Sequence, residues 1–199
     1  KRALRKATIA MQITPVLCGS SCKNRGVQHL IDAIVDYLPS PLDVEEVKGV
    51  NPKTDAEEIR KSSDEEPFAG LAFKIVADPF VGKLNMIRVF TGTLKSGMTV
   101  VNATTGEKER INSLYLMKGK KQEAVDELVA GDIGAVNKLV CTNTGDTLAD
   151  ESFKVKYDEI PFPKPVLTMA IRAAKSGEED KVFQGLQRLA EEDLTFKVE

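Results

Sequence analysis

The sequence predicts a mainly β protein with a central Greek-key-type β-barrel, flanked by a truncated α/β segment and a truncated α+β segment. Two observations support this fold class. Between residues 68 and 162, short apolar runs alternate with turn signals made of glycine, proline and aspartate, and this spacing favours a closed barrel over an open sheet. Apolar residues at helical spacing occur only towards the two ends of the chain.

The first element that we expect is a helix over residues 3–10. A buried strand over Ile13–Cys18 follows and ends at Gly19. Apolar residues then recur at helical spacing from Val27 to Leu38, and the prolines that come next stop the helix. Residues 1–41 are therefore predicted to be the closing unit of an α/β domain.

Residues 42–67 differ in character from the segments on either side. Acidic residues are frequent there and aromatic residues are absent. This composition is typical of a linker or a solvated connection. We therefore predict an acidic linker over residues 42–67.

The barrel is assigned to residues 68–162. One turn is expected at Asp78 and Pro79, because proline fixes φ and aspartate hydrogen-bonds forward to the backbone. A β domain of about 90 residues buries roughly 60–65% of its unfolded surface, so this part can fold alone. The candidate strands are 71–76, 84–90, 98–103, 109–117, 133–138 and 153–156.

The last part of the chain, residues 163–199, follows a stiff proline-rich hinge at Pro161–Pro165. We expect a strand over Val166–Ile171, a helix over Glu178–Glu192 and a second strand from Thr195. This order suits a small α+β domain. Because the chain begins with lysine and ends inside a predicted strand, we expect it to be a piece of a longer protein.

Composition excludes several classes of protein. The 28 basic and 30 acidic residues nearly balance, so any contact with nucleic acid must come from a local basic patch. No apolar run has the length of a membrane span, and no signal-peptide pattern follows the basic start. Three cysteines do not make a disulfide framework, which indicates a reducing cytoplasm.

A longer string carries a family resemblance. The residues Asp78-Pro-Phe-Val-Gly-Lys-Leu84 and Arg88-Val-Phe-Thr-Gly-Thr-Leu-Lys-Ser-Gly97 resemble the second domain of translational GTPases, most closely bacterial elongation factor G. Residues 13–41 resemble the end of the family's GTP-binding domain. Leu189-Ala-Glu-Glu-Asp193 resembles the start of its third domain.

The resemblance covers essentially the whole chain. It makes residues 1–41 the remnant of the GTP-binding domain, 68–162 domain II, and 163–199 the start of a ferredoxin-like domain III. Three departures stand out: Ser21 replaces alanine, Leu194 replaces proline, and residues 118–123 look more like an elongation-factor-G-like paralogue.

The resemblance implies a ribosome-dependent GTPase that promotes translocation of tRNA and mRNA. The implied partners are the ribosome, through RNA of its small subunit, and the GTP-binding domain of the same chain; no membrane is implied. GTP or GDP with magnesium is implied for the intact parent and none for this piece. Two alternatives stay open: a ribosomal-protection or release GTPase, and a stand-alone β-barrel interaction module.

No catalytic residue is assigned in this chain. The phosphate-cradling Gly-x4-Gly-Lys-Ser/Thr loop, the Asp-x-x-Gly segment and the guanine-reading Asn-Lys-x-Asp segment are all absent from the sequence. Phosphoryl transfer depends on such a lysine, a Mg²⁺ ligand and a positioned water. We therefore predict that the parent is a GTPase and that this piece by itself is inactive.

A guanine-side loop is implied at Ser20, Ser21 and Cys22. In the family, this loop follows a glycine and borders the guanine base, where backbone N–H groups face the base oxygen. For the isolated piece, a plain strand-to-helix turn with a serine cap explains the same residues.

A basic cluster is the best local candidate for contact with ribosomal RNA, and such binding would be electrostatic and sensitive to salt. A solvated loop is the alternative, favoured by the neighbouring acids Glu107, Glu109 and Glu123. The predicted nucleic-acid-binding residues are Lys118, Lys120, Lys121, Lys108 and Arg110.

Two further groups receive structural interpretations. Lys83 and Arg88 are interpreted as residues of the barrel itself, with contact to the GTP-binding domain as the alternative. Cys18, Cys22 and His29 lack a fourth ligand at suitable spacing, so no metal site is assigned and buried thiols are expected.

Overall fold

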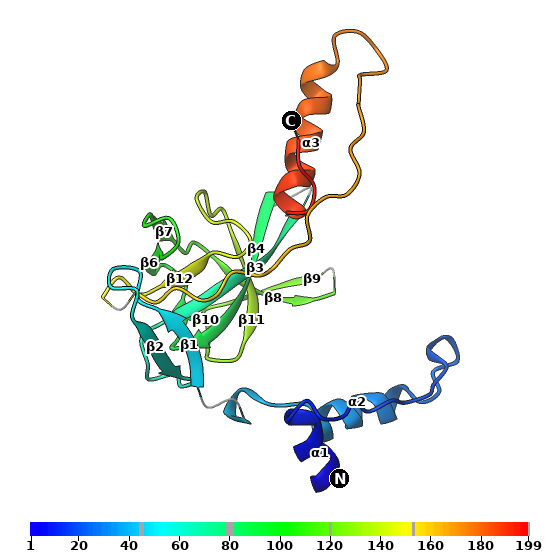
Figure 1. Cartoon of the computed structure of the whole chain (residues 1–199), viewed down its shortest axis with the longest axis vertical. Helices are drawn as coiled ribbons and strands as arrows, with labels where there is room; N and C mark the ends of the chain where they lie inside the picture. Colours follow the sequence, from blue (N-terminus) through cyan, green and yellow to red (C-terminus); the bar gives the residue numbers. More distant parts are fainter. Residues whose placement is uncertain (44–45, 79–81, 120, 153, 199) are drawn as a thin grey trace. The chain divides into compact units, whose positions relative to one another are not determined.

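The structure, a computed structural model, describes residues 1–43, 46–78, 82–119, 121–152 and 154–198. It divides into two units, Lys1–Glu45 and Glu46–Glu199, which are described separately below. Figure 1 shows the elements of both units along the chain.

The first unit contains two helices, α1 (Arg2–Ile9) and α2 (Val27–Tyr37), and two short 3-10 turns, η1 (Ser21–Lys23) and η2 (Pro41–Asp43). Both predicted helices are confirmed. The predicted buried strand over Ile13–Cys18 is wrong, since Val16 is 87% exposed and no strand forms there. A buried strand needs neighbours to pair its backbone. In the described part of this unit, the only bridge joins Ser20 to Arg25.

One residue that joins the two helices of this unit is Arg5. The Arg5 guanidinium donates to the carbonyl oxygen of Leu38 at 2.9 Å and lies 2.5 Å from a carboxylate oxygen of Asp43. The same Asp43 oxygen accepts from the backbone N–H and the hydroxyl of Ser40. These Ser40 hydrogen bonds, with the nearby Arg5 charge, hold the pKa of Asp43 below its usual value.

The second unit begins with a hairpin, β1 (Glu46–Val50) and β2 (Glu57–Lys61). The predicted linker is therefore wrong for these residues. Their charges are arranged across the hairpin, with Lys48 Nζ 3.4 Å from Glu57 Oε1. Gly49 packs so closely on Val155 that an added Cβ would lie 2.5 Å from its methyl group. Composition alone does not reveal this contact.

The centre of the second unit is an eight-stranded antiparallel sheet, in the order β7-β6-β12-β3-β4-β11-β8-β9. Two shorter strands, β5 (Leu94–Lys95) and β10 (Glu127–Leu128), pair separately. The strands of the large sheet are β3 (Ala69–Asp78), β4 (Gly82–Thr91), β6 (Thr99–Asn102), β7 (Lys108–Arg110), β8 (Leu114–Lys118), β9 (Lys121–Val125), β11 (Ile133–Asn137) and β12 (Thr147–Ala149).

The mainly β fold class is confirmed, and the sheet curls on itself (Figure 1). β11 returns between β4 and β8, and β12 returns between β3 and β6, which are Greek-key connections. The edge strands β7 and β9 do not pair with each other among the described residues. The sheet is therefore a half-barrel, where the sequence predicted a closed cylinder.

Most predicted strands are found, with two differences. The run 109–117 is two strands, β7 and β8, because the chain leaves the sheet between Arg110 and Leu114. Of the run 153–156, residue 153 lies outside the described residues, and Lys156 makes one bridge to Val50. In this part of the chain, strands β5, β9, β10 and β12 are not predicted. Of the expected Asp78-Pro79 turn, Pro79 lies outside the described residues.

The core lies between the curled faces of the sheet. Ile87 and Val89 of β4 are fully buried there, beside Leu114 of β8 and Val136 of β11. A smaller cluster on the other side of β3 contains Tyr157, whose ring meets the Phe90 ring edge-on at 4.9 Å between centroids.

The last part of the chain contains α3 (Glu179–Glu192), which confirms the predicted helix. The predicted strands over Val166–Ile171 and from Thr195 do not form in the described residues. Val166 is 100% exposed, so nothing in the described structure pairs with this segment. Strand formation needs a partner that the local sequence does not supply.

Candidate functional site

The predicted guanine-side loop is a tight, exposed turn. Ser20 and Arg25 close it by mutual backbone hydrogen bonds of 2.8 and 3.0 Å, and η1 forms its tip. Gly26 has φ +79°, and an added Cβ there would lie 2.9 Å from the Cys18 carbonyl oxygen. Only glycine fits this close crossing of the chain.

Two backbone N–H groups of the loop have no acceptor within it. The amides of Ser21 and Cys22 stand at the first positions of the 3-10 turn, which have no acceptor within the turn. Ser20, Ser21 and Cys22 are all exposed, and so is Cys18, which contradicts the expectation of buried thiols there. The N–H groups of Ser21 and Cys22 therefore gain no hydrogen bond from the turn itself. Their role at guanine remains a prediction.

The first part of the predicted basic cluster lies on the β8–β9 hairpin. Lys118 and Lys121 stand opposite each other in the register of the two strands, and both are exposed. Lys118 Nζ is 2.5 Å from Glu123 Oε2. Lys121 makes no ion pair with any described residue. Lys120 lies outside the described residues.

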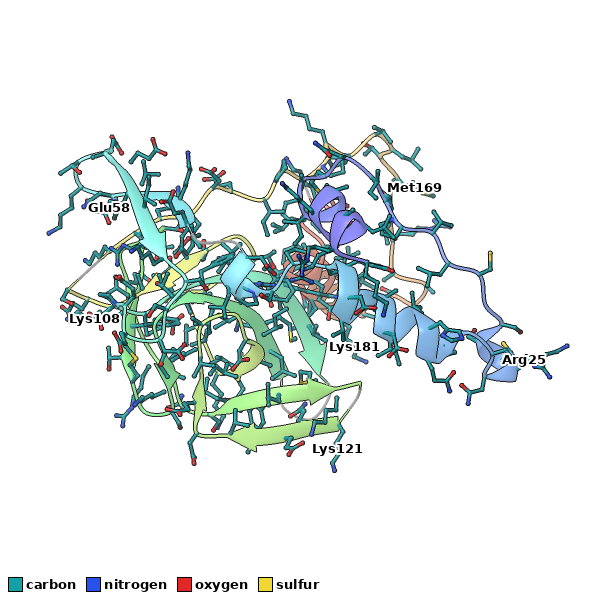
Figure 2. The ribbon with its side chains drawn as sticks, turned by 90° about the horizontal axis from the view of Figure 1, so that it is seen from below. Arg25, Glu58, Lys108, Lys121, Met169 and Lys181 are labelled. Atoms are coloured by element: carbon teal, nitrogen blue, oxygen red, sulfur yellow. The ribbon has the colours of Figure 1, made fainter. Side chains whose placement is uncertain are left out.

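The second part lies on β7. Lys108 Nζ is 2.5 Å from Glu151 Oε1, whereas the exposed Arg110 has no ion-pair partner within the described ranges. In sheet order, β7 and β9 are the two opposite edges. Figure 2 accordingly shows Lys108 and Lys121 on separate sides of the sheet. The structure thus divides the expected cluster into two small basic surfaces.

One residue between the basic positions of β7 has a role that sequence reasoning missed. Glu109 is only 5% exposed, and its carboxylate accepts from the Cys141 N–H at 2.6 Å and the Thr142 hydroxyl at 3.1 Å. It anchors the loop that connects β11 to β12. The alternation of a strand would have indicated it, since Lys108 and Arg110 point outward and Glu109 therefore inward.

A second buried polar contact holds the same loop. Asn102 is fully buried and donates to Asp146 at 2.9 Å, and Asp146 also accepts from the Asn143 N–H at 2.8 Å. Nearby, a hydrogen bond to Glu107, together with loss of solvent, raises the pKa of the Cys141 thiol to about 11. This thiol is therefore a weak nucleophile near neutral pH.

Lys83 and Arg88 make contacts inside the sheet unit. Lys83 Nζ is 3.4 Å from the Asn143 side-chain oxygen, and the Arg88 guanidinium carbon lies 5.8 Å from the centre of the Phe90 ring. These contacts support the structural interpretation of both residues.

Two kinds of feature are absent from the described residues. No group of three or more histidine, cysteine, aspartate or glutamate side chains is placed to hold a metal ion. None of the described helices combines the length and the apolar character needed to cross a membrane.

Comparison with known proteins gives the family. Residues 67–151 match the family described as elongation factor G domain 2, and residues 162–199 match elongation factor G, domain III. A crystal structure of a protein from Thermus thermophilus is similar over 100% of this chain, with a TM-score of 0.75 and 26% identity. The match covers 27% of that protein, so the chain spans about a quarter of its length.

Two family domains thus follow each other in one chain, and the first coincides with the curled sheet described above. The chain belongs to the elongation factor G family of translation factors.

Proposed function

We propose that the chain is part of a ribosome-dependent GTPase that promotes the movement of tRNA and mRNA on the ribosome. In this protein, the curled sheet serves as the surface that docks on RNA of the small ribosomal subunit in the cytoplasm. The observation that carries the proposal is that elongation factor G domains 2 and III follow each other along this chain. The sheet that corresponds to domain 2 has its own buried apolar core.

The two basic surfaces are the proposed points of contact with RNA. Lys121 and Arg110 are exposed without an ion-pair partner in the described structure, so their charges are available to phosphate. Lys118 and Lys108 each have a carboxylate at 2.5 Å. Exposed pairs of this kind contribute about 0–1 kcal/mol, so a phosphate can displace the carboxylate at little cost.

The proposed nucleotide of the whole protein is GTP or GDP with magnesium. The residues of this chain fit only the base side of that site, since the exposed Ser20–Cys22 turn offers N–H groups that have no acceptor within the turn. The sequence has no phosphate-cradling loop and no residue set for magnesium and the attacking water. The chemistry therefore belongs to residues outside this sequence, and the chain alone is expected to be inactive.

Binding to purified small ribosomal subunits tests the docking role. A double variant, Lys121→Glu with Arg110→Glu, should weaken binding and lower the slope of log affinity against log salt by about one for each lost contact. A second double variant, Lys48→Glu with Lys61→Glu, makes the same charge change at exposed positions of β1 and β2 and is the matched control. Equal loss with the control, or no binding by the unaltered chain, would overturn the docking role.

Titration calorimetry with GDP tests the assignment of the nucleotide site. The 199-residue chain should show no binding of GDP at micromolar concentrations. Micromolar binding would contradict the proposal that the phosphate and magnesium site lies outside this sequence. For the full-length protein, a toeprinting assay reports movement of mRNA by one codon. Movement supports translocation, and its absence beside intact ribosome-stimulated GTP hydrolysis favours a protection or release role.

A further inference from the structure

One side of strand β3 is open where α3 approaches it. β3 pairs with β4 along its whole length, but on its other side it pairs with β12 only from Ala69 to Leu71. Ala72 still exchanges hydrogen bonds with Gly145 and Asp146. From residue 73 onward, the described strands supply no partner on this side, and an uncovered sheet edge invites unwanted pairing.

The chain that leads to α3 does not fix the position of this helix. Residues 161–172 are all exposed and form no helix or strand (Figure 1, the extended segment before α3). A hollow of about 690 Å³ lies beside α3. Its lining includes Asn143, from the loop before β12, and Phe183, Gln187 and Leu194 within or beside α3, so the apolar packing there is loose. Phe183 and Leu189 remain about half exposed, at 52% and 51%.

One direct polar contact crosses from the helix to the open edge. The Glu192 carboxylate, in the last turn of α3, accepts a hydrogen bond from the Ala77 backbone N–H of β3. A carboxylate satisfies a free strand N–H with a charge-assisted bond, which is stronger than a neutral one. We propose that this Glu192–Ala77 contact is a latch that positions α3 on the β3 edge and so sets the angle across the proline-rich link.

The latch has a structural and a conformational consequence. While it is closed, α3 covers the open edge of β3 at Ala77. When it opens, nothing in the exposed segment 161–172 restrains the helix, and the edge N–H faces solvent. The contact thus couples the end of the β3–β4 hairpin to the segment that matches domain III.

Amide hydrogen exchange and a spin label on the 199-residue chain test the latch together. Cys18, Cys22 and Cys141 are replaced by serine, and Arg188→Cys on the exposed face of α3 carries the label. With Glu192→Ala, the Ala77 amide should exchange about tenfold faster, because a hydrogen bond to a charged group contributes about 1.5 kcal/mol or more. The paramagnetic broadening of β3 amides by the label should fall at the same time.

Glu191→Ala is the matched control, since Glu191 adjoins Glu192 and lines the hollow but makes no hydrogen bond to β3 within the part of the chain that the structure describes. It should change neither readout. Glu192→Gln, which keeps a side-chain oxygen, should restore part of the protection. The latch is overturned if Glu192→Ala leaves both readouts unchanged, if Glu191→Ala changes them equally, or if Glu192→Gln exchanges as fast as Glu192→Ala.

Discussion

The curled sheet and the first 43 residues are held together by different forces. In the sheet, fully buried side chains such as Ile87 and Val89 close an apolar core, and glycines permit close backbone approaches. In the first unit, helix α2 leaves Ile31, Ile34 and Val35 exposed, and Arg5 joins the helices through polar contacts. The stability of the sheet should therefore depend on volume and backbone space, and that of the first unit on charge.

Backbone space gives the largest expected effect. At Gly92, φ is +69° and an added Cβ would lie 2.5 Å from the Glu66 carbonyl oxygen and 2.6 Å from the Phe68 nitrogen. Gly92→Ala should lower the free energy of unfolding by more than about 4 kcal/mol or prevent folding, because backbone atoms cannot give way. Circular dichroism during urea unfolding measures it.

Gly97→Ala is the control for Gly92. Its φ is +82°, but nothing lies within 4 Å of an added Cβ. The left-handed conformation alone should cost about 1–2 kcal/mol. Equal losses of stability at the two glycines would show that the close backbone approach at Gly92 is unimportant. They would contradict the claim that backbone space determines the stability of the sheet.

Core volume gives the next effect. Ile87→Ala should cost about 2–5 kcal/mol, because the side chain is 0% exposed and the surrounding sheet cannot fill the cavity. Ile59→Ala, at a strand position that is 53% exposed, should stay within about 0.5 kcal/mol. Urea unfolding of the two variants distinguishes them. Similar losses would contradict an apolar core confined to the curled sheet.

Charge in the first unit gives a smaller effect. Arg5→Met should loosen α1 from α2 at a cost of about 1 kcal/mol or less, and NMR should show changed amide chemical shifts in α1. In the unaltered chain, added salt should weaken the same contact between Arg5 and Asp43. Since the folded pKa of Asp43 is lowered, its contribution is present above its ordinary pKa and is lost as the pH falls through the folded value. An acid-insensitive unit would refute this.

The smallest expected effect concerns the reactivity of the Cys141 thiol, which should be low near neutral pH. Because the pKa of Cys141 is raised from 9.0 to about 11, its thiolate fraction near neutral pH is about 100-fold below that of an unperturbed thiol. Alkylation of Cys141 should stay slow until the pH approaches 11. Glu107→Gln should speed it at lower pH, and mass spectrometry of each cysteine shows whether it does.

Local pattern predicted the elements whose signals are contained in their own residues. The helical spacing of Val27 to Leu38, stopped by prolines, gave α2, and the spacing near Leu189 gave α3. The alternating runs around the Asp78 turn gave the long strands β3 and β4. The family resemblance came from the same string and was confirmed by the domain 2 and domain III matches.

The misses share one cause, since each depends on a partner distant in sequence. The hairpin at Glu46–Lys61 was hidden by its acidic composition, and its Gly49 is fixed by contact with Val155. The expected strand at Ile13–Cys18 has no neighbour in the described residues. The basic residues were predicted to form one group, but the sheet order separates Lys108 and Arg110 on β7 from Lys121 on β9.

Local pattern was enough to predict the mainly β class and the helices, because turn residues and apolar periodicity act over a few neighbouring positions. The residue string from Asp78 to Gly97 was enough to indicate the family. Long-range contacts of the folded chain fix the order of the sheet strands, the contact of Glu109 with the loop before β12, and the contact of Glu192 with Ala77. These contacts join residues tens of positions apart, and no local pattern of side chains specifies which distant backbone group a carboxylate will find.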